Sequence, residues 1–483
     1  MRPGGLRALA GALAAGALAG GCAPKTAYVR PAANPPTAFR ENADWKPAHP
    51  GDRIVRGAWW SVFHDPALDA LEARIAVSNQ TLKAAQAQFE QARAAIGYNR
   101  AGLAPQVGSD PGITRASQSQ NRATPAIRGS YADFLLPASV SYEADVWGRV
   151  RGLVANSRAA AEASAADVEL VSLSLHAELA VDYFALRGVD ADKELLDEAV
   201  ANYQKAVDLT GNRYRGGLAS QADLAQAETQ LETTRAQAID VGVERASLEH
   251  AIAVLVGQSA STFTLPPAAA TTEPPRIPAG LPADLLERRP DIAGAERRVA
   301  AASAEIGVAR AAYYPVLSLT GAAGFESASL GSWIAGLSNF WAAGPAALIN
   351  VFDAGRRRAV NREAQAAYAQ AVAAYQQSVL VAFQEVEDNL AALRLLDEEA
   401  RVQAQAVSAA ERSLTLATNR YRGGVTSYLE VITAQNAALF NERTAVTLRT
   451  RRLAASVLLV KALGGGWDAS ALPQTIAAGG TRR

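Results

Sequence analysis

The chain of 483 residues is long enough for two or three ordinary domains, and its 47 basic residues balance its 47 acidic residues. This balance gives no support to a nucleic-acid-binding protein, which needs an excess of basic residues on one face. The only cysteine is Cys22, so an internal disulfide is excluded, and the four histidines show no ligand spacing. We therefore predict no metal site and no partner nucleic acid.

The N-terminus has the features of an export signal. A short basic start precedes the apolar run ALAGALAAGALA (8–19), whose last two residues begin LAGGC (18–22). The run is too short for a membrane-spanning helix. A cysteine after small residues is typical of a bacterial lipoprotein signal, with a plain cleaved signal as the alternative. We predict a signal peptide over 1–21, a covalent lipid on Cys22 as the only attached group, and a lipidated, extended segment over 22–65.

The hexapeptide NRYRGG occurs at 212–217 and again at 419–424, and the residues around the two copies also match in register. Such internal repetition indicates one structural unit made twice. The sequence predicts two tandem repeats over 66–257 and 284–464, joined by a Pro-rich linker over 258–283 and followed by a C-terminal tail over 465–483.

Long antiparallel helices are expected to dominate each repeat. No Gly or Pro occurs from Arg356 to Arg422, and apolar residues recur there at steps of three and four. A helix of this length would extend roughly 100 Å, which is typical of coiled coils and tubular assemblies. We expect helices over about 66–104, 148–211 and 219–257 in the first repeat and about 290–313, 354–418 and 426–463 in the second.

Each hexapeptide is expected to end a long helix. The glycines of RGG suit the left-handed backbone that follows a helix C-terminus. SQAD (220–223) and SYLE (427–430) each have the pattern of a capping box, with Ser at the N-cap and an acid three residues later. A tight helix–turn–helix tip is therefore predicted in each repeat.

A stretch in which apolar and polar residues alternate precedes each of the long central helices. LPASVSYEADVW (136–147) and LSLTGAAGF (317–325) alternate apolar residues with Ser, Thr, Glu and Asp, as half-apolar strands do. The sequence predicts two strands in each repeat, over about 105–115 and 129–146, then about 315–326 and 340–352.

Aromatic residues collect where the strands meet the helices, and belts of Tyr and Trp mark membrane interfaces. Ordinary packing is the alternative for each residue alone. The residues predicted to lie at a membrane interface are Trp147, Tyr313, Tyr314 and Phe352.

Four strands cannot close a barrel, and an open edge in lipid leaves backbone groups unpaired. No stretch after the signal reaches the ~20 apolar residues of a membrane helix, so we expect any membrane crossing to use strands. Several chains must then pool their strands. The apolar face would point outward to lipid and the polar face inward to water.

Six segments in order carry a resemblance to a known family. In them the chain resembles the outer membrane factor family, the TolC-like channels of tripartite efflux pumps, and within it the NodT-type lipoproteins. The segments are WWSVFHDPALDALE (59–72), YEADVWGRVR (142–151), LPADLLERRPDIAGAERRVAAASAEIGVARAAYYPVLSLTG (281–321), NVFDAGRRR (350–358), AYQQSVLVAFQEVEDNLAAL (374–393) and KALGGGW (461–467).

The resemblance implies a mostly α fold with membrane β-strands. A homotrimer would build a 12-stranded β-barrel in the outer membrane of a Gram-negative bacterium, joined to an α-helical barrel in the periplasm. Such a protein is no enzyme: it is a passive export duct opened at its periplasmic tip. Its implied partners are outer-membrane lipid, a periplasmic membrane-fusion adaptor and an inner-membrane transporter of the resistance-nodulation-division (RND) type.

The resemblance also implies roles for residues near the tips. Asp223, Glu430 and Tyr421 match the periplasmic gate, while Thr426 stands where some members carry a latch arginine, which leaves closure to Tyr421 and helix packing. As capping-box acids, Asp223 and Glu430 would have a purely local role. The exposed tip turns match the adaptor-docking site, although tight turns need glycine anyway: Arg215, Gly216, Gly217, Leu218, Arg422, Gly423, Gly424 and Val425.

Arginines at helix N-termini are disfavoured by the helix dipole. Arg149, Arg151 and residues 356–358 stand at such positions. Our hypothesis is that they meet lipid phosphates under the barrel, with ordinary solvated charge as the alternative.

Two other functions remain open at this stage. One is the outer-membrane duct of a type I protein secretion system. The other is a lipid-anchored coiled-coil structural protein, which gives no reason for alternating strands in each repeat. Enzyme motifs such as GxSxG, a Walker loop or a Rossmann fingerprint are missing from the sequence.

Overall fold

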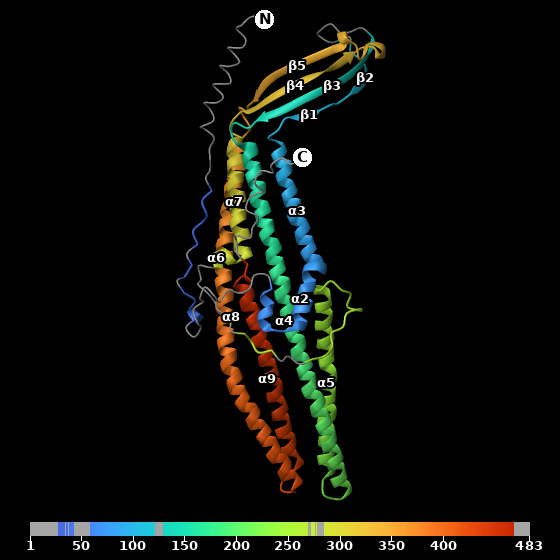
Figure 1. The fold of residues 1–483 in the computed structure, drawn as a ribbon, viewed down its shortest axis with the longest axis vertical. Coiled ribbons are helices and arrows are strands. Elements are labelled where there is room, and N and C mark those ends of the chain that lie inside the picture. The colour runs from blue at the N-terminus through green and yellow to red at the C-terminus, as the bar shows by residue number, and fades with distance from the viewer. Residues whose placement is uncertain are drawn as a thin grey trace. The chain divides into compact units, whose positions relative to one another are not determined.

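The computed structural model describes residues 28–33, 35–36, 38–42, 58–119, 121, 129–268, 272–275, 277 and 285–467. The predicted signal peptide, Cys22 and most of the predicted C-terminal tail lie outside these residues. The chain divides into two compact units, and Figure 1 labels their helices and strands. Unit 1 comprises Met1–Ala32, Gln88–Ser164 and Gly294–Gln376, and unit 2 comprises Ala33–Ala87, Ala165–Ala293 and Gln377–Arg483.

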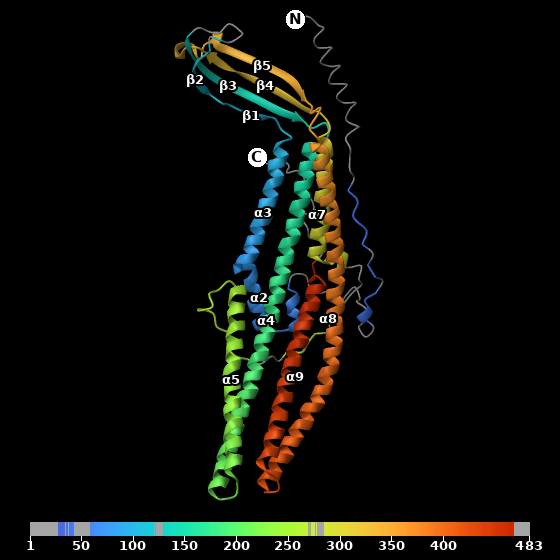
Figure 2. The same cartoon turned by 180° about the vertical axis from the view of Figure 1, so that it is seen from behind.

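Unit 1 contains one antiparallel sheet to which both repeats contribute. Its order is β1-β3-β4-β5, and β2 pairs with β3 beside β1 (Figures 1 and 2). The strands are β1 (Gln106–Gly108), β2 (Gly112–Ser117), β3 (Ser130–Ala144), β4 (Val316–Ser327) and β5 (Asn339–Leu348).

The single strand expected over about 105–115 is two strands in the structure. The stretch between β1 and β2 contains Pro111, which has no N–H to donate to a ladder. Both short strands pair with β3, β1 around Val140 and β2 around Phe134. They therefore follow one another along the same edge of β3 and occupy one strand position.

The register of β3 and β4 brings their two apolar patterns onto one face of the sheet. Leu136 lies opposite Phe325 and Tyr142 opposite Leu319, whereas Ser141 lies opposite Thr320. Residues directly opposite each other in an antiparallel pair share a face. The alternation in the two repeats thus produces one apolar face and one polar face.

The helices account for most of the chain, which confirms the mostly α fold class. Figure 1 shows α4 beside α5 and α8 beside α9, each pair joined by a short turn in unit 2. The bounds are α2 (Pro66–Ser78), α3 (Gln80–Ala101), α4 (Arg149–Arg215), α5 (Gln221–Leu255), α6 (Leu285–Arg288), α7 (Pro290–Ala311), α8 (Arg356–Arg422) and α9 (Tyr428–Ala462).

The helix expected over about 66–104 is interrupted at Asn79. Asn79 has extended backbone (φ −64°, ψ 126°), and its side-chain oxygen accepts the Leu82 N–H at 2.9 Å. Its side-chain amide donates to the Leu255 carbonyl oxygen, 2.8 Å away at the end of α5. Asn79 therefore ends α2, caps α3 and binds α5 with one side chain.

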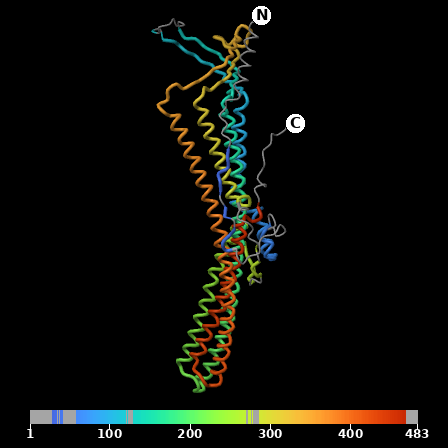
Figure 3. Tube along the Cα trace, turned by 90° about the vertical axis from the view of Figure 1, so that its left-hand side faces the viewer, coloured from blue at the N-terminus to red at the C-terminus, as the bar shows by residue number. Residues whose placement is uncertain are grey.

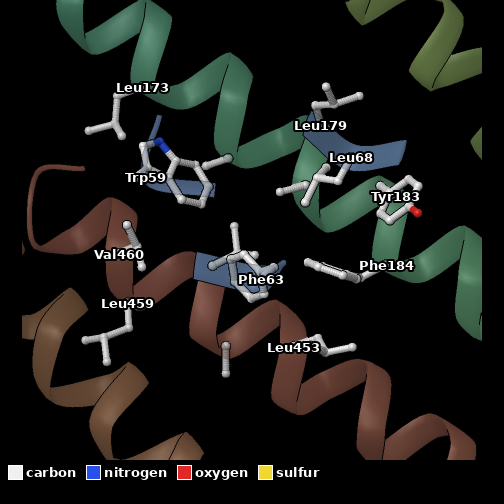
Figure 4. Packing of buried hydrophobic residues seen from close by; sticks show 14 of the residues in the cluster. Trp59, Phe63, Leu68, Leu173, Leu179, Tyr183, Phe184, Leu453, Leu459 and Val460 are labelled. Atoms are coloured by element: carbon white, nitrogen blue, oxygen red, sulfur yellow. The ribbon is translucent and has the colours of Figure 1, made fainter. Parts of the chain in front are cut away.

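The largest core lies in unit 2 and includes the 3₁₀-helix η3 (Trp59–Phe63). Figure 4 shows Trp59 and Phe63 among side chains of α4 and α9, such as Phe184 and Leu453. Trp59 and Phe63 are each 2% exposed. Fully burying one large apolar side chain contributes about 1.5–3 kcal/mol, so η3 is a strong link between these helices.

The N-terminal segment also contacts the helices. Phe39 belongs to the unit 2 core, and the backbone N–H groups of Arg40 and Glu41 donate to the Glu387 carboxylate at 2.7 and 3.0 Å. In unit 1, the Tyr28 hydroxyl donates to the Glu296 carboxylate, and burial raises the pKa of Tyr28. Tyr28, Arg40 and Glu41 of the extended segment are thus held by residues of the second repeat.

Candidate functional site

The two NRYRGG copies form the same turn. The second glycine of each has φ +73°, a left-handed conformation that favours glycine (Gly217 and Gly424). The N–H of the next residue donates to the carbonyl oxygen five residues earlier, at 2.7 Å from Leu218 to Arg213 and at 3.0 Å from Val425 to Arg420. This is a Schellman motif, and Figure 3 shows both turns at the same end of unit 2.

The residues matched to adaptor docking all lie on these turns and are exposed. Leu218 is 76% exposed and Val425 is 71% exposed. Each turn therefore exposes one apolar side chain that follows an arginine and two glycines in the sequence. The geometry is compatible with docking, which stays a prediction.

The two tyrosines of the hexapeptides have different surroundings. Tyr214 is 42% exposed, whereas Tyr421 is 7% exposed and its ring centre lies 5.2 Å from that of Tyr428. The Arg213 guanidinium lies 4.7 Å from the centre of the Tyr421 ring, and its Nη1 donates to the Tyr421 carbonyl oxygen at 2.8 Å. The Tyr421 hydroxyl lies 3.4 Å from Thr210 Oγ1. Tyr421 therefore joins the end of α8 to the end of α4.

Sequence reasoning singled out Tyr421 but missed Arg213. Arg213 and Arg420 occupy the same place in identical hexapeptides, so no local signal distinguishes them. Only the pairing of the two hairpins places Arg213 on a tyrosine of the other repeat.

The two gate acids also differ. Ser220 donates its N–H and its Oγ to Asp223 Oδ2 at 3.0 and 2.8 Å, and the Asp223 N–H donates to Ser220 Oγ, which confirms the first capping box. The second predicted box is wrong, because the Ser427 side chain makes no capping hydrogen bond. Glu430 lies instead 3.9 Å from Arg420 Nη1, and both side chains are more than half exposed. Such a pair contributes little stability, so the Glu430 carboxylate stays available to solvent.

The aromatic residues at the strand–helix junction form contacts within unit 1. Trp147 stacks on Tyr314 with ring centres 4.6 Å apart, and its Nε1 donates to the Pro315 carbonyl oxygen at 2.8 Å. Arg357 lies 5.5 Å from the centre of the Tyr313 ring. Phe352 differs from them, because it is 88% exposed. Trp147 and Tyr314 thus join the two repeats, and their predicted interface role stays a prediction.

Three of the five junction arginines have carboxylate partners, which narrows the phosphate hypothesis. Arg149 binds Glu143 at 2.6 Å, and two more ion pairs join Arg151 to Asp145 and Arg357 to Asp353. Asp145 also accepts backbone N–H groups at the start of α4, where the helix dipole favours an acid. In the described parts of the chain, the side chains of Arg356 and Arg358 form no ion pair. Only these two fit the original hypothesis.

A buried titratable pair lies in the unit 2 core. Glu72 Oε2 is 2.5 Å from His176 Nδ1, and the imidazole stacks on Trp60 with ring centres 4.4 Å apart. Burial, with the Asp69 charge as a smaller cause, raises the pKa of Glu72 to about 9. Burial lowers the pKa of His176 to about 4. Both groups are therefore neutral at pH 7.

The described residues contain neither a membrane-spanning helix nor a cluster of metal ligands. None of the helices there combines the length and the apolar composition needed to cross a bilayer. Within the same residues, no three His, Cys, Asp or Glu side chains are grouped so as to hold a metal ion.

Comparison with known proteins finds matches along almost the whole chain. A family model described as outer membrane efflux protein matches residues 72–258 and 281–465. The toluene efflux pump outer membrane protein TtgC of Pseudomonas putida is 31% identical over 451 residues, which is 93% of each chain. Outer membrane protein OprJ of Pseudomonas aeruginosa is 31% identical over 460 residues, covering 93% of this chain and 94% of OprJ.

Solved structures share the fold. The outer-membrane channel OprN matches with a TM-score of 0.86 and 28% identity, over 92% of this chain and 100% of its own. CusC, whose structures were solved to follow conformational changes during folding and transmembrane channel formation, matches with a TM-score of 0.81 and 27% identity. The match covers 92% of this chain and 100% of the CusC chain. These comparisons confirm the resemblance drawn from the sequence.

Proposed function

This chain belongs to the outer membrane efflux protein family, and we propose that three copies of it form one passive duct that opens at the helix tips. The protein is an outer-membrane component of an efflux pump, as its relatives are.

The open sheet is the observation that carries the proposal. Among the described residues, β5 pairs only with β4, and β1 and β2 pair only with β3. Both edges therefore present unpaired backbone groups, which a lipid environment penalises by several kcal/mol each. One chain supplies four strand positions, so three chains would supply the twelve of a closed barrel. The exposed Leu319 and Trp341 would then face lipid.

Unpartnered apolar positions on the helices support the same assembly. Leu395, Val402, Ala409 and Leu416 recur at every seventh residue of α8, and we call them the α8 seam. Leu395, Val402 and Leu416 are 52%, 63% and 64% exposed. A heptad of exposed apolar residues is typical of a helix that packs against another helix. In a trimer the seam would contact a neighbouring copy.

The gate would lie at the two tip turns. Tyr421 and its contacts with Arg213 would hold the closed state, and copies of Asp223 and Glu430 would place carboxylates around the throat and favour cations. The exposed turns would receive a periplasmic adaptor protein, which would connect the duct to an inner-membrane RND-type transporter. A lipid on Cys22 would anchor the N-terminus to the outer membrane.

The test combines assembly, conductance and function. The mature protein, purified from the outer membrane, is expected to run as a trimer in light scattering and to conduct ions in a planar bilayer. In the source bacterium, deleting the gene should increase sensitivity to the cargo of its pump, and the wild-type gene should restore resistance. A monomer without conductance would overturn the proposed assembly. A conducting trimer that restores no efflux phenotype but restores protein secretion would support the type I alternative.

A further inference from the structure

The linker between the repeats is held by two charged side chains of the first repeat. Arg245 Nη2 donates to the Leu265 carbonyl oxygen at 2.7 Å, and Arg245 Nε donates to Asp190 Oδ1, also at 2.7 Å. Asp190 Oδ2 accepts the Ala268 N–H at 3.0 Å. Arg245 and Asp190 therefore bind the linker through its backbone, and we call them the first clamp.

The second repeat contains the same pair. The NRYRGG copies begin at 212 and 419, an offset of 207 residues, which leads from Asp190 to Asp397 and from Arg245 to Arg452. Arg452 Nη2 donates to Asp397 Oδ1 at 2.6 Å, so α8 and α9 repeat the pairing of α4 and α5. We call Asp397 and Arg452 the second clamp.

The two clamps differ in what covers them. The Asp190 side chain is 3% exposed, whereas the Asp397 side chain is 56% exposed. Among the described residues, no backbone N–H donates to the Asp397 carboxylate, and the Arg452 side chain donates to no carbonyl oxygen. A backbone-binding pair that is covered in the first repeat is therefore uncovered in the second.

The C-terminal tail has a sequence that matches the linker. The first clamp binds the linker at Leu265-Pro266, and the offset of 207 leads to Leu472-Pro473, which lie outside the described residues. A residue that precedes proline favours extended backbone, in which carbonyl and N–H groups point away from the chain axis. The tail thus repeats the part of the linker that the first clamp binds.

The distance along the chain also matches. Arg245 lies ten residues before the end of α5, and Arg452 lies ten residues before the end of α9. Ten helical residues extend about 15 Å. Trp467 follows α9 directly, and the five residues from Trp467 to Leu472 can extend up to about 17 Å. The tail is therefore long enough to return along α9 to the second clamp.

We propose that the tail around Leu472-Pro473 binds the second clamp of its own chain, as the linker binds the first. Arg452 donates to the Leu472 carbonyl oxygen, and Asp397 accepts the Thr475 N–H. These two bonds match the backbone bonds of the first clamp, residue for residue. The inference concerns contacts within one chain and does not depend on the proposed trimer or its export function.

The tail would then bind beside the N-terminal segment. Arg394 Nη2 donates to Glu41 Oε2 of that segment at 2.7 Å, whereas Arg187, the matching residue of the first repeat, donates to the Pro266 carbonyl oxygen. Asp397 stands three residues after Arg394 on α8, so the two side chains are neighbours on one face of the helix. One face of α8 would therefore hold both the N-terminal segment and the tail.

Hydrogen exchange of the purified full-length protein, measured by mass spectrometry with electron-transfer fragmentation, tests the proposal. The Ala268 amide is the internal reference, because its N–H is bonded in the structure. We expect the Thr475 amide to exchange at least tenfold more slowly than in a synthetic peptide of residues 468–483. Its protection should be weaker than that of the reference, because Ser456 stands where Glu249 accepts a further linker N–H.

Removing either clamp residue should remove the protection. Asp397→Ala, at an exposed helical position that tolerates change, and Arg452→Gln should each return the Thr475 amide to within threefold of the peptide rate and leave the Ala268 amide unchanged. The control is Arg451→Gln, which removes the neighbouring exposed arginine, paired with Glu399, and should exchange like wild type. A Thr475 amide that exchanges at the peptide rate in wild type, or equal protection in both clamp variants and wild type, would overturn the proposal.

Photocrosslinking identifies what covers the second clamp. Arg401 is exposed and lies one turn after Asp397, so Arg401→benzoylphenylalanine places a photoreactive group beside the clamp. We expect a crosslink to residues 471–476 within the same chain, which migrates as a monomer after full denaturation. A crosslinked dimer, a crosslink to another protein, or a crosslink only to other parts of the same chain would contradict the proposed occupant.

Discussion

Arg213 binds Tyr421 through two contacts, a 2.8 Å hydrogen bond from Nη1 to the carbonyl oxygen and a guanidinium 4.7 Å from the ring centre. Arg213 stands in the last turn of α4 and Tyr421 in the last turn of α8. One arginine of the first repeat therefore holds a tyrosine of the second. A hydrogen bond from a charged group contributes about 1.5–3 kcal/mol, and an exposed cation–π contact about 0.5–1 kcal/mol.

We expect Arg213→Gln to favour the open tip. Losing the charged contacts should shift the closed–open equilibrium toward the open state by about tenfold or more, since 1.4 kcal/mol corresponds to a factor of ten. Single-channel conductance in planar bilayers measures this shift. The control is Arg420→Gln, the same change at the matching position, which loses only an exposed pair with Glu430. Equal conductance in the two variants would contradict the role of Arg213.

The Glu72–His176 pair predicts a pH-dependent stability. The pKa of Glu72 is raised from 4.5 to about 9, so its contribution is complete below pH 4.5 and is lost as pH rises through 9. The pKa of His176 is lowered from 6.5 to about 4, so its contribution is complete above pH 6.5 and is lost as pH falls through 4. Between pH 6.5 and 9 only Glu72 of this pair changes its contribution, so the free energy of unfolding should fall as pH rises.

Thermal melting of wild type and Glu72→Gln at pH 6.5, 7.5 and 9 tests this prediction. The wild-type melting temperature should fall across the series, and that of Glu72→Gln should stay level, because an amide has no proton to lose. Glu72→Ala leaves His176 unpaired and should cost about 1–3 kcal/mol at pH 6.5, and its difference from wild type should shrink as pH rises, because only wild type loses stability there. A level wild-type curve would show that Glu72 is already ionised at pH 6.5.

Replacing Gly217 and Gly257 with alanine should cost different amounts of folding free energy. Gly217 and Gly257 both have positive φ, +73° and +68°, so an alanine at either is strained by about 1–2 kcal/mol. A Cβ at Gly217 would meet nothing within 4 Å, whereas at Gly257 it would lie 2.4 Å from the Ser78 carbonyl oxygen. Gly257→Ala should therefore lose a further ~1–3 kcal/mol. Melting temperatures of the two variants give the comparison, and equal losses would show that the backbone near Ser78 adapts.

The α8 seam predicts a loss of assembly. In Val402→Asp/Leu416→Asp, two charges replace apolar side chains whose burial in a trimer would contribute about 1.5–3 kcal/mol each. We expect a smaller fraction of trimer in size-exclusion chromatography with light scattering. Ala404→Asp, at an exposed position two residues from Val402 and on the opposite face of α8, serves as control for the lower helix propensity of Asp. A double variant as trimeric as the control would exclude the seam from the interface.

The patterns that repeat along the chain were predictable from the sequence. A helix without Gly or Pro from Arg356 to Arg422 is what the structure contains as α8. The alternation of apolar and polar residues in β3 and β4 likewise predicts the two faces of the sheet, because successive side chains of a strand point to opposite faces. Such features depend on neighbours along the chain, and the sequence shows those directly.

Contacts between distant residues were not predictable in the same way. Asn79 interrupts a good helical pattern because it binds the Leu255 carbonyl oxygen, and no Gly or Pro marks the place. The residues from Ser427 to Glu430 match the sequence pattern of a capping box, but the Ser427 side chain makes no capping hydrogen bond and Glu430 lies near Arg420.

The unequal burial of Tyr214 and Tyr421 has a consequence for how the gene tolerates change. Both codons specify the same residue within the same six letters, yet one side chain is 42% exposed and the other 7% exposed. In a saturation library selected for survival on a toxic compound, codon 214 should accept many amino acids and codon 421 few. The same hexapeptide would then tolerate substitution to different extents in the two repeats.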